Sequence, residues 1–226
     1  WEAQYDQLQA QFRRARPEKQ TDVAAITAWL RMGEQQAARL STADYDASAL
    51  EQALPAMRAL SLRPAKEIAP GLSALCAGAG VALVFVPALP RTHVTGVARW
   101  VAGKPLIQLS LLGKWNDGFW FSLFHEIAHV LKHPTRAIFL DDASSGDTVQ
   151  SAEEQEANRF ATDVLIPRAR QSELMSLALE DRSVAAFAQQ LGVHPGIVVG
   201  QLQHRKRIGW DHALTRLKAR YEIAKR

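Results

Sequence analysis

The stretch from Phe119 to Leu131 reads FWFSLFHEIAHVL, and it decides the fold prediction. Its apolar residues cover nearly all sides of a helix, which predicts a buried helix that begins near Asn116 and ends before Pro134. His125 and His129 are four residues apart in this stretch. Their imidazoles are therefore expected on one face of the helix, about one turn apart, where they can bind one ion.

Glu126 lies between the two histidines, directly after His125, and its carboxylate can take part in catalysis. Neutral imidazole is a good zinc donor, and a catalytic zinc site needs three protein ligands and one open position for water. Zinc lowers the pKa of that water, and Glu126 can accept its proton as the water attacks a carbonyl. A chance match on a buried helix is disfavoured because three ionisable side chains in apolar surroundings need a metal or partner to compensate their desolvation. A purely structural zinc site would leave Glu126 without a task.

The third ligand is expected from the segment that begins Glu153-Glu154-Gln155-Glu156. On a helix Glu154 and Asn158 share one face, so Glu154 can bind the metal while Asn158 fixes a ligand imidazole. Glu153 and Glu156 point elsewhere, and an acidic first helical turn explains them without a metal. We therefore predict His125, His129 and Glu154 as ligands of Zn²⁺, with Asn158 in support and Glu126 as the catalytic residue.

Three other polar residues are weaker candidates for the site. His133 lies eight residues after His125, which adds about 12 Å of helix rise, so we expect it at the surface or helix end. His93 and Arg99 could stabilise an oxyanion from the sheet side, although a structural role is favoured for both.

A small sheet is predicted before the motif helix. Val81–Val86 has the length and β-branched content of a buried strand, and Val94–Val101 and Pro105–Ser110 flank a short turn containing Gly103. These two runs predict a hairpin, and one of its strands is expected to offer a free edge to an extended peptide. The fold class is therefore α+β.

Helical patterns surround this region. Residues 1–63 are rich in helix formers, with Thr21 and Asp46 as expected N-caps, and a short helix is expected over Leu72–Ala77. Asp141–Ser151 is predicted to be a mobile loop, followed by a helix over Ala152–Val164. We expect three parts: an N-terminal helical region (1–65), the core (66–170) and a C-terminal helical region (171–226).

Within the C-terminal part, Val184–Leu202 has the spacing of a helix-turn-helix with Gly192 in the turn. Its second helix is apolar, which favours packing against the core over DNA reading. The basic run Arg205-Lys206-Arg207 keeps the DNA interpretation open.

Composition sets broad limits. The 226 residues carry a net charge of +4 and 47% hydrophobic residues, as in ordinary globular proteins. The uncharged stretch Ile68–Pro90 is broken by glycines and prolines, so it is expected to be buried core and no membrane contact is expected. The single cysteine, Cys76, and the lack of a secretory leader predict a cytoplasmic location. The oligomeric state is left open.

The two segments FWFSLFHEIAHVL and EEQEANRFATDVLIP (Glu153–Pro167) together resemble the ImmA/IrrE family of zinc metallo-endopeptidases, over roughly Leu72 to Pro167. The resemblance implies a zincin-like core, in which a small mixed sheet packs on the HExxH helix. It also implies a gluzincin-like ligand set whose third member is a Glu four residues before an Asn, which corresponds to Glu154 and Asn158. This agrees with the prediction made above from helix geometry.

Characterised members of that family cut helix-turn-helix repressors and thereby release stress-response or mobile-element genes, so the resemblance implies a regulatory endopeptidase with a protein substrate. The chain is also similar to a subgroup fused to Xre or HigA-type helix-turn-helix regulators. Residues 1–63 show no such module, so DNA contact is expected only through a segment upstream of residue 1. The alternative is a transcriptional regulator or antitoxin whose zinc-site domain senses a signal with weak or no proteolysis.

Overall fold

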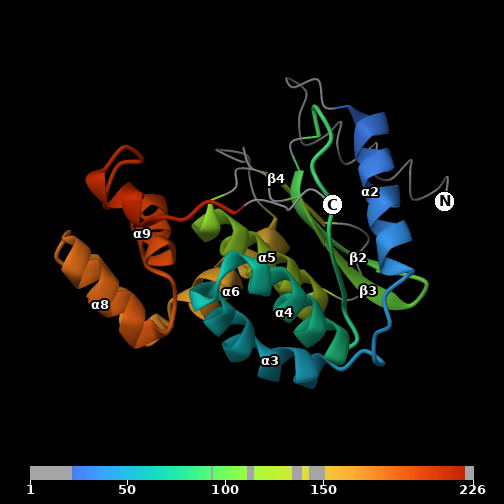
Figure 1. The fold of residues 1–226 in the computed structure, drawn as a ribbon, viewed down its shortest axis with the longest axis horizontal. Coiled ribbons are helices and arrows are strands. Elements are labelled where there is room, and N and C mark those ends of the chain that lie inside the picture. The colour runs from blue at the N-terminus through green and yellow to red at the C-terminus, as the bar shows by residue number, and fades with distance from the viewer. Residues whose placement is uncertain (1–21, 93, 111–114, 134–138, 143–150, 222–226) are drawn as a thin grey trace.

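The chain folds around a mixed four-stranded sheet with helices on both faces (Figure 1). A computed structural model describes residues 22–92, 94–110, 115–133, 139–142 and 151–221. The strands are β1 (Ala82–Phe85), β2 (Val94–Val101), β3 (Lys104–Leu109) and β4 (Phe139–Asp142). Their order is β1-β3-β2-β4, with β1 parallel to β3 and with β2 antiparallel to both β3 and β4. The predicted α+β class is confirmed.

The hairpin between β2 and β3 is as predicted, and its turn residues Ala102 and Gly103 both have positive φ, 49° and 79°. Such angles give the backbone twist that joins two antiparallel strands through two residues. The expectation that a hairpin strand is free was wrong, because β2 and β3 are both paired on two sides. Among the described strands, the outer ones are β1 and β4.

Strand β4 was not predicted, and its last residues, Asp141 and Asp142, fall in the expected loop. Four residues are too few for a periodic pattern, and the strand forms by pairing with the distant β2. The rest of that expected loop, residues 143–150, lies outside the described residues.

One face of the sheet is covered by α2 (Val23–Ala37). Its N-cap is Asp22, whose side chain accepts the backbone N–H of Ala25; the predicted cap, Thr21, lies outside the described residues. Trp29 donates its indole N–H to the carbonyl of Val86 at 3.0 Å. Such bonds hold α2 close to the strands.

The other face carries α3 (Ala47–Ala59), α4 (Ala65–Gly78), α5 (Asn116–Lys132) and α6 (Ala152–Leu165). Asp46 caps α3 as predicted, accepting two backbone N–H groups. The α4 helix is longer than the predicted Leu72–Ala77 and contains Pro70. Its buried residues Ile68, Leu72 and Cys76 are spaced four apart, so packing of one apolar face outweighs the hydrogen bond that proline removes.

The motif helix α5 has the bounds that the sequence predicts, and it is buried. Trp120, Leu123, Phe124 and Ile127 have no exposed surface and form the centre of the core. The helix α6 packs beside it. Both helices are packed into the core, so side chains that project between them have defined positions.

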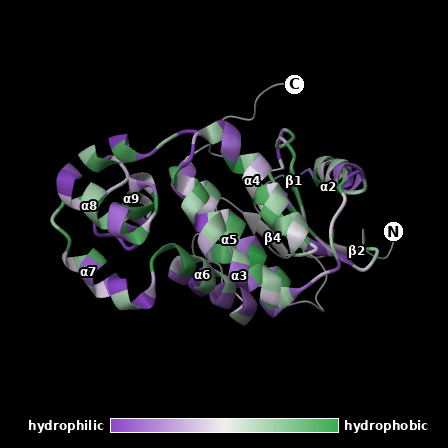
Figure 2. Ribbon diagram, turned by 60° about the horizontal axis from the view of Figure 1, so that its bottom comes forward, coloured by the Kyte–Doolittle hydropathy of each residue, from purple (hydrophilic) through white to green (hydrophobic). Residues whose placement is uncertain are grey.

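The C-terminal helices lie at the opposite end of the molecule from α2 (Figures 1 and 2). They are the 3₁₀ turn η2 (Arg168–Arg170), α7 (Gln171–Ser176), α8 (Asp181–Leu191), α9 (Pro195–His204) and the 3₁₀ turn η3 (Ala213–Leu217). Gly192 ends α8 with φ 67°, which gives the helix-turn-helix shape expected from the sequence. No helix in the described part of the chain is long and apolar enough to span a membrane.

Candidate metal centre

The three polar residues of the motif are buried in α5, as are Asn116 and Asp117 at its start. His125 and His129 are 2% exposed and Glu126 is fully buried. They lie in a helix whose other buried residues are mostly apolar. Burying two imidazoles and a carboxylate in apolar surroundings costs free energy unless a hydrogen-bonding partner or an ion of opposite charge compensates it.

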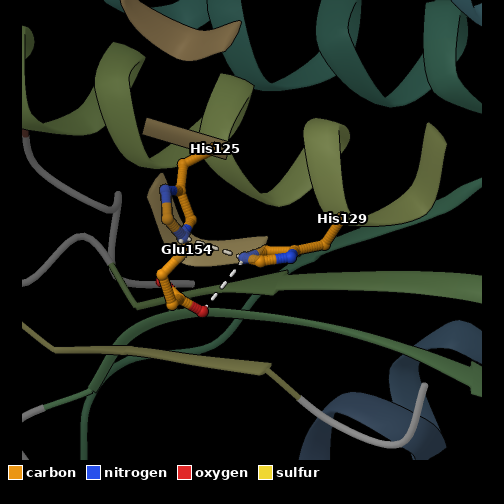
Figure 3. Close-up of side chains that lie close together, drawn as sticks. All are labelled: His125, His129 and Glu154. Atoms are coloured by element: carbon orange, nitrogen blue, oxygen red, sulfur yellow. Dashed lines mark hydrogen bonds and ion pairs between the residues drawn. The ribbon is translucent and has the colours of Figure 1, made fainter. Parts of the chain in front are cut away.

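Glu154 of α6 meets the two histidines (Figure 3). One carboxylate oxygen lies 3.2 Å from His125 Nε2 and the other lies 3.4 Å from His129 Nε2. The two Nε2 atoms are themselves 3.0 Å apart. One potential ligand atom from each side chain lies within 4.8 Å of the others, so the set has the spacing of a metal site.

The start of α6 explains why Glu154 and no other glutamate of this segment reaches the histidines. Ser151 is the N-cap and its hydroxyl accepts the backbone N–H of Glu154, which places Glu154 in the first turn. Glu156 faces away and lies 3.7 Å from His133. His133 itself is the C-cap residue of α5, at the helix end where the sequence predicts it, and outside the cluster.

Asn158, one turn beyond Glu154, supports His125. Its side-chain oxygen lies 3.0 Å from His125 Nδ1. An amide oxygen can only accept, so this contact places a proton on Nδ1 of His125 and leaves its Nε2 facing Glu154 and His129. Two ring nitrogens and a carboxylate then face one another, an arrangement that a cation between them would stabilise.

The electrostatics favour the charge states that a metal needs. Burial alone would raise the pKa of Glu154, but hydrogen bonds with His125 and His129 outweigh burial and lower this pKa to about 2. Burial lowers the pKa of His129 below its ordinary value. These two shifts favour an ionised Glu154 and a neutral His129 at neutral pH, and two His with one Glu is a donor set found in catalytic zinc sites.

Gly96 of β2 lies directly against Glu126. A Cβ atom at position 96 would come 2.7 Å from Glu126 Oε1 and 3.0 Å from its Cγ. The missing side chain thus makes the space in which the Glu126 carboxylate sits between α5 and the sheet. Gly96 was not predicted as a site residue from the sequence, although a glycine inside a strand often marks a close approach.

Arg99 is on β2 but belongs to the face covered by α2. It is 7% exposed, and its guanidinium donates to Glu34 at 2.6 Å and to the Leu30 carbonyl at 2.6 Å. The structural role favoured for Arg99 fits these contacts. His93 lies outside the described residues.

Residues 116–207 match the model of a known protein family, the IrrE N-terminal-like domain (Peptidase_M78). The match begins with α5 and extends through α6 into the C-terminal helices. It supports an ImmA/IrrE-type domain of metallopeptidase character in this part of the chain. A search among curated proteins found no match.

Proposed function

We propose that the chain is a zinc-dependent endopeptidase in which His125, His129 and Glu154 hold the metal and Glu126 is the general base. The observation that carries the proposal is the convergence of two imidazoles from α5 and one carboxylate from α6 within 4.8 Å. Zinc is preferred over harder cations because nitrogen supplies two of the three donors. The match to the Peptidase_M78 family supports the reaction class.

The chain's own residues divide the work. Zinc, when bound, would polarise the substrate carbonyl and acidify a water molecule. Glu126, held one residue from His125 and against Gly96, accepts the proton of the attacking water and returns it to the leaving amine. Asn158 keeps His125 in the tautomer and orientation that ligation needs.

Strand β4 offers a place for an extended substrate. Among the described strands it is an outer one, pairing with β2 alone, and it packs against α5. A peptide that adds to this edge would satisfy its backbone hydrogen bonds beside the metal ligands. We propose β4 in place of the hairpin strands as the recognition edge.

The resemblance to the ImmA/IrrE family supports a regulatory role, with a helix-turn-helix repressor or a similar protein as substrate. A cytoplasmic location goes with such a substrate. A fused Xre or HigA-type module would have to lie upstream of residue 1.

The alternative, a DNA-binding regulator that does not cleave, gains no support from the C-terminal helix pair. Gly196 to Gln203 of α9 are all buried, so the second helix of this pair packs on the protein and cannot enter a DNA groove. A mobility shift of DNA by this chain at physiological salt, without cleavage of any partner, would favour the alternative.

The test compares Glu126→Gln with Glu156→Gln, a matched change on an exposed glutamate of α6. Candidate repressors are captured on Glu126→Gln, then incubated with each zinc-loaded protein, and fragments are identified by mass spectrometry. We expect cleavage by the wild type and by Glu156→Gln, and a loss of about 10²- to 10⁴-fold for Glu126→Gln with zinc still bound. Undiminished cleavage by zinc-loaded Glu126→Gln would contradict the proposed role.

A further inference from the structure

The face of α5 that carries the metal ligands continues toward the start of the helix. His129, His125, Phe121 and Asp117 follow one another at steps of four residues. Each step advances about 6 Å along the helix and keeps nearly the same direction. Phe121 is therefore the next side chain after His125 on the face that holds the metal.

A row of rings extends from the metal centre over Phe121. The Phe121 ring lies 6.1 Å from the His125 ring, centroid to centroid, and stacks at 6.1 Å and 17° on His204 at the end of α9. His204 in turn meets Trp210 edge to face at 5.2 Å. We call Phe121, His204 and Trp210 the aromatic wall.

Contacts of Lys218, Asp117 and Gly200 hold the aromatic wall in place. Lys218 forms a buried ion pair with Asp117 at 2.6 Å, and its Nζ lies 5.3 Å from the Trp210 ring centroid. A Cβ at Gly200 would come 2.4 Å from Asp117 Oδ2, so α9 lies tightly on α5. The row of rings therefore has a fixed position, with Phe121 next to the ligand His125.

Core packing does not account for the outer part of the wall. Trp210 is 62% exposed, the most exposed large apolar side chain in the described part of the chain, and His204 is exposed as well. The close approach at Gly200 already fixes α9 on α5, and the ion pair fixes Lys218, the residue after η3, on α5 without Trp210. A tryptophan exposed to water at the outer end of a row of rings that begins at His125 is a typical anchor for an apolar group of a binding partner.

We propose that Phe121, His204 and Trp210 form a subsite for a large apolar side chain, aromatic by preference, of the substrate residue that flanks the scissile bond. The proposal rests on the proposed peptidase function. Ring faces and edges of the wall offer stacked and edge-to-face contacts to an incoming ring. Small or charged side chains at this position of the substrate would leave the wall in water.

The test needs no identified substrate. Zinc-loaded full chain is titrated with phenylalanine hydroxamate and with alanine hydroxamate, whose zinc-binding group is the same, and affinities are measured by calorimetry. We expect about ten-fold tighter binding of the phenylalanine compound, the size of one good aromatic contact. Trp210→Ala and His204→Ala should each reduce this ratio at least three-fold and leave the affinity for the alanine compound unchanged.

The matched control is Met32→Ala, which removes an exposed apolar side chain from α2 at the other end of the molecule and should keep the wild-type ratio. Equal binding of the two hydroxamates by the wild type would overturn the subsite while leaving the metal site intact. A phenylalanine preference that survives both Trp210→Ala and His204→Ala would overturn it too. If the zinc-loaded chain binds neither compound, the open metal position of the proposed function is wrong, and the subsite fails with it.

Discussion

The two faces of the sheet each bury a polar cluster, and the two clusters differ in how their charges are balanced. Under α2, the guanidinium of Arg99 and the carboxylate of Glu34 meet at 2.6 Å, and Gln108 donates to the Trp29 carbonyl at 2.7 Å. In this cluster each of these hydrogen-bond donors, on Arg99 and Gln108, faces an acceptor oxygen. On the α5 side, Glu154 meets two imidazoles whose Nε2 atoms lie 3.0 Å apart and both face its carboxylate.

The comparison shows that burial of polar groups does not by itself mark a functional site. The α2 cluster pairs a cation with an anion and holds a helix on the sheet. The α5 cluster combines two imidazoles with one carboxylate, which is the donor set of a candidate metal site. The kind of donors, and how they are paired, separates a structural network from a metal centre.

The largest expected effect breaks the α2 cluster. Glu34→Ala leaves the guanidinium of Arg99 buried without its carboxylate, which should lower the free energy of unfolding by about 3–5 kcal/mol. Denaturant unfolding measures the loss, and zinc content should stay at the wild-type value. The double variant Glu34→Leu/Arg99→Met should recover most of the stability, and an equally unstable double variant would show that the ion pair is not the cause.

Gly96→Ala acts on the α5 face instead. Its Cβ would displace the Glu126 carboxylate, and a displacement of about 1 Å can reduce turnover about 100-fold. Peptidase kinetics with zinc determination measure the effect, which should fall on kcat and spare zinc binding. Gly118→Ala, on α5 like Glu126 but with open space around it, is the control and should behave as the wild type. Full activity of Gly96→Ala would mean that Glu126 needs no fixed position.

Asn158→Ala should weaken zinc binding about 10- to 100-fold, because outer residues that orient ligand histidines contribute that much. Competition with a chelator of known affinity measures it. Asn158→Asp keeps an acceptor for His125 Nδ1 and should lose less. Equal affinity for Asn158→Ala and the wild type would remove Asn158 from the metal centre.

The smallest effect concerns His194, the N-cap of α9, whose Nδ1 accepts the Gly196 N–H at 3.0 Å and contacts the Asn116 amide at 2.8 Å. Burial lowers the pKa of His194, so the unfolded chain takes up this proton more readily than the folded chain. The stability that His194 contributes is present above its ordinary pKa of about 6.5 and is lost as pH falls toward the folded value. His194→Asn keeps a capping acceptor without titration, and unfolding at pH 7.5 and 5.5 should show a smaller loss for it than for the wild type.

The sequence predicted the parts of the molecule that depend on local spacing. The bounds of α5 and the shared face of His125 and His129 follow from helical periodicity. The pairing of Glu154 with Asn158 on α6 follows from the same four-residue step. These patterns are contained within single helices, so no knowledge of the fold was needed.

Features that depend on distant residues were not predictable in this way. Strand β4 exists because it pairs with β2, about forty residues earlier in the chain. Phe121 could have been flagged from its position four residues before His125, but nothing local indicated that His204 and Trp210 would cover it. The α4 helix was predicted too short because its packed face outweighs the break that Pro70 suggests.

Metal content decides most directly whether the α5 cluster is a metal centre. Zinc bound per chain, and its affinity, would be measured for the wild type, for Glu154→Ala and for the control Glu156→Ala. We expect one zinc per chain in the wild type and the control, and an affinity lowered more than about 100-fold in Glu154→Ala, beyond the loss from an outer residue. A wild type that takes up no zinc, or a Glu154→Ala variant that binds it as tightly, would contradict the assignment.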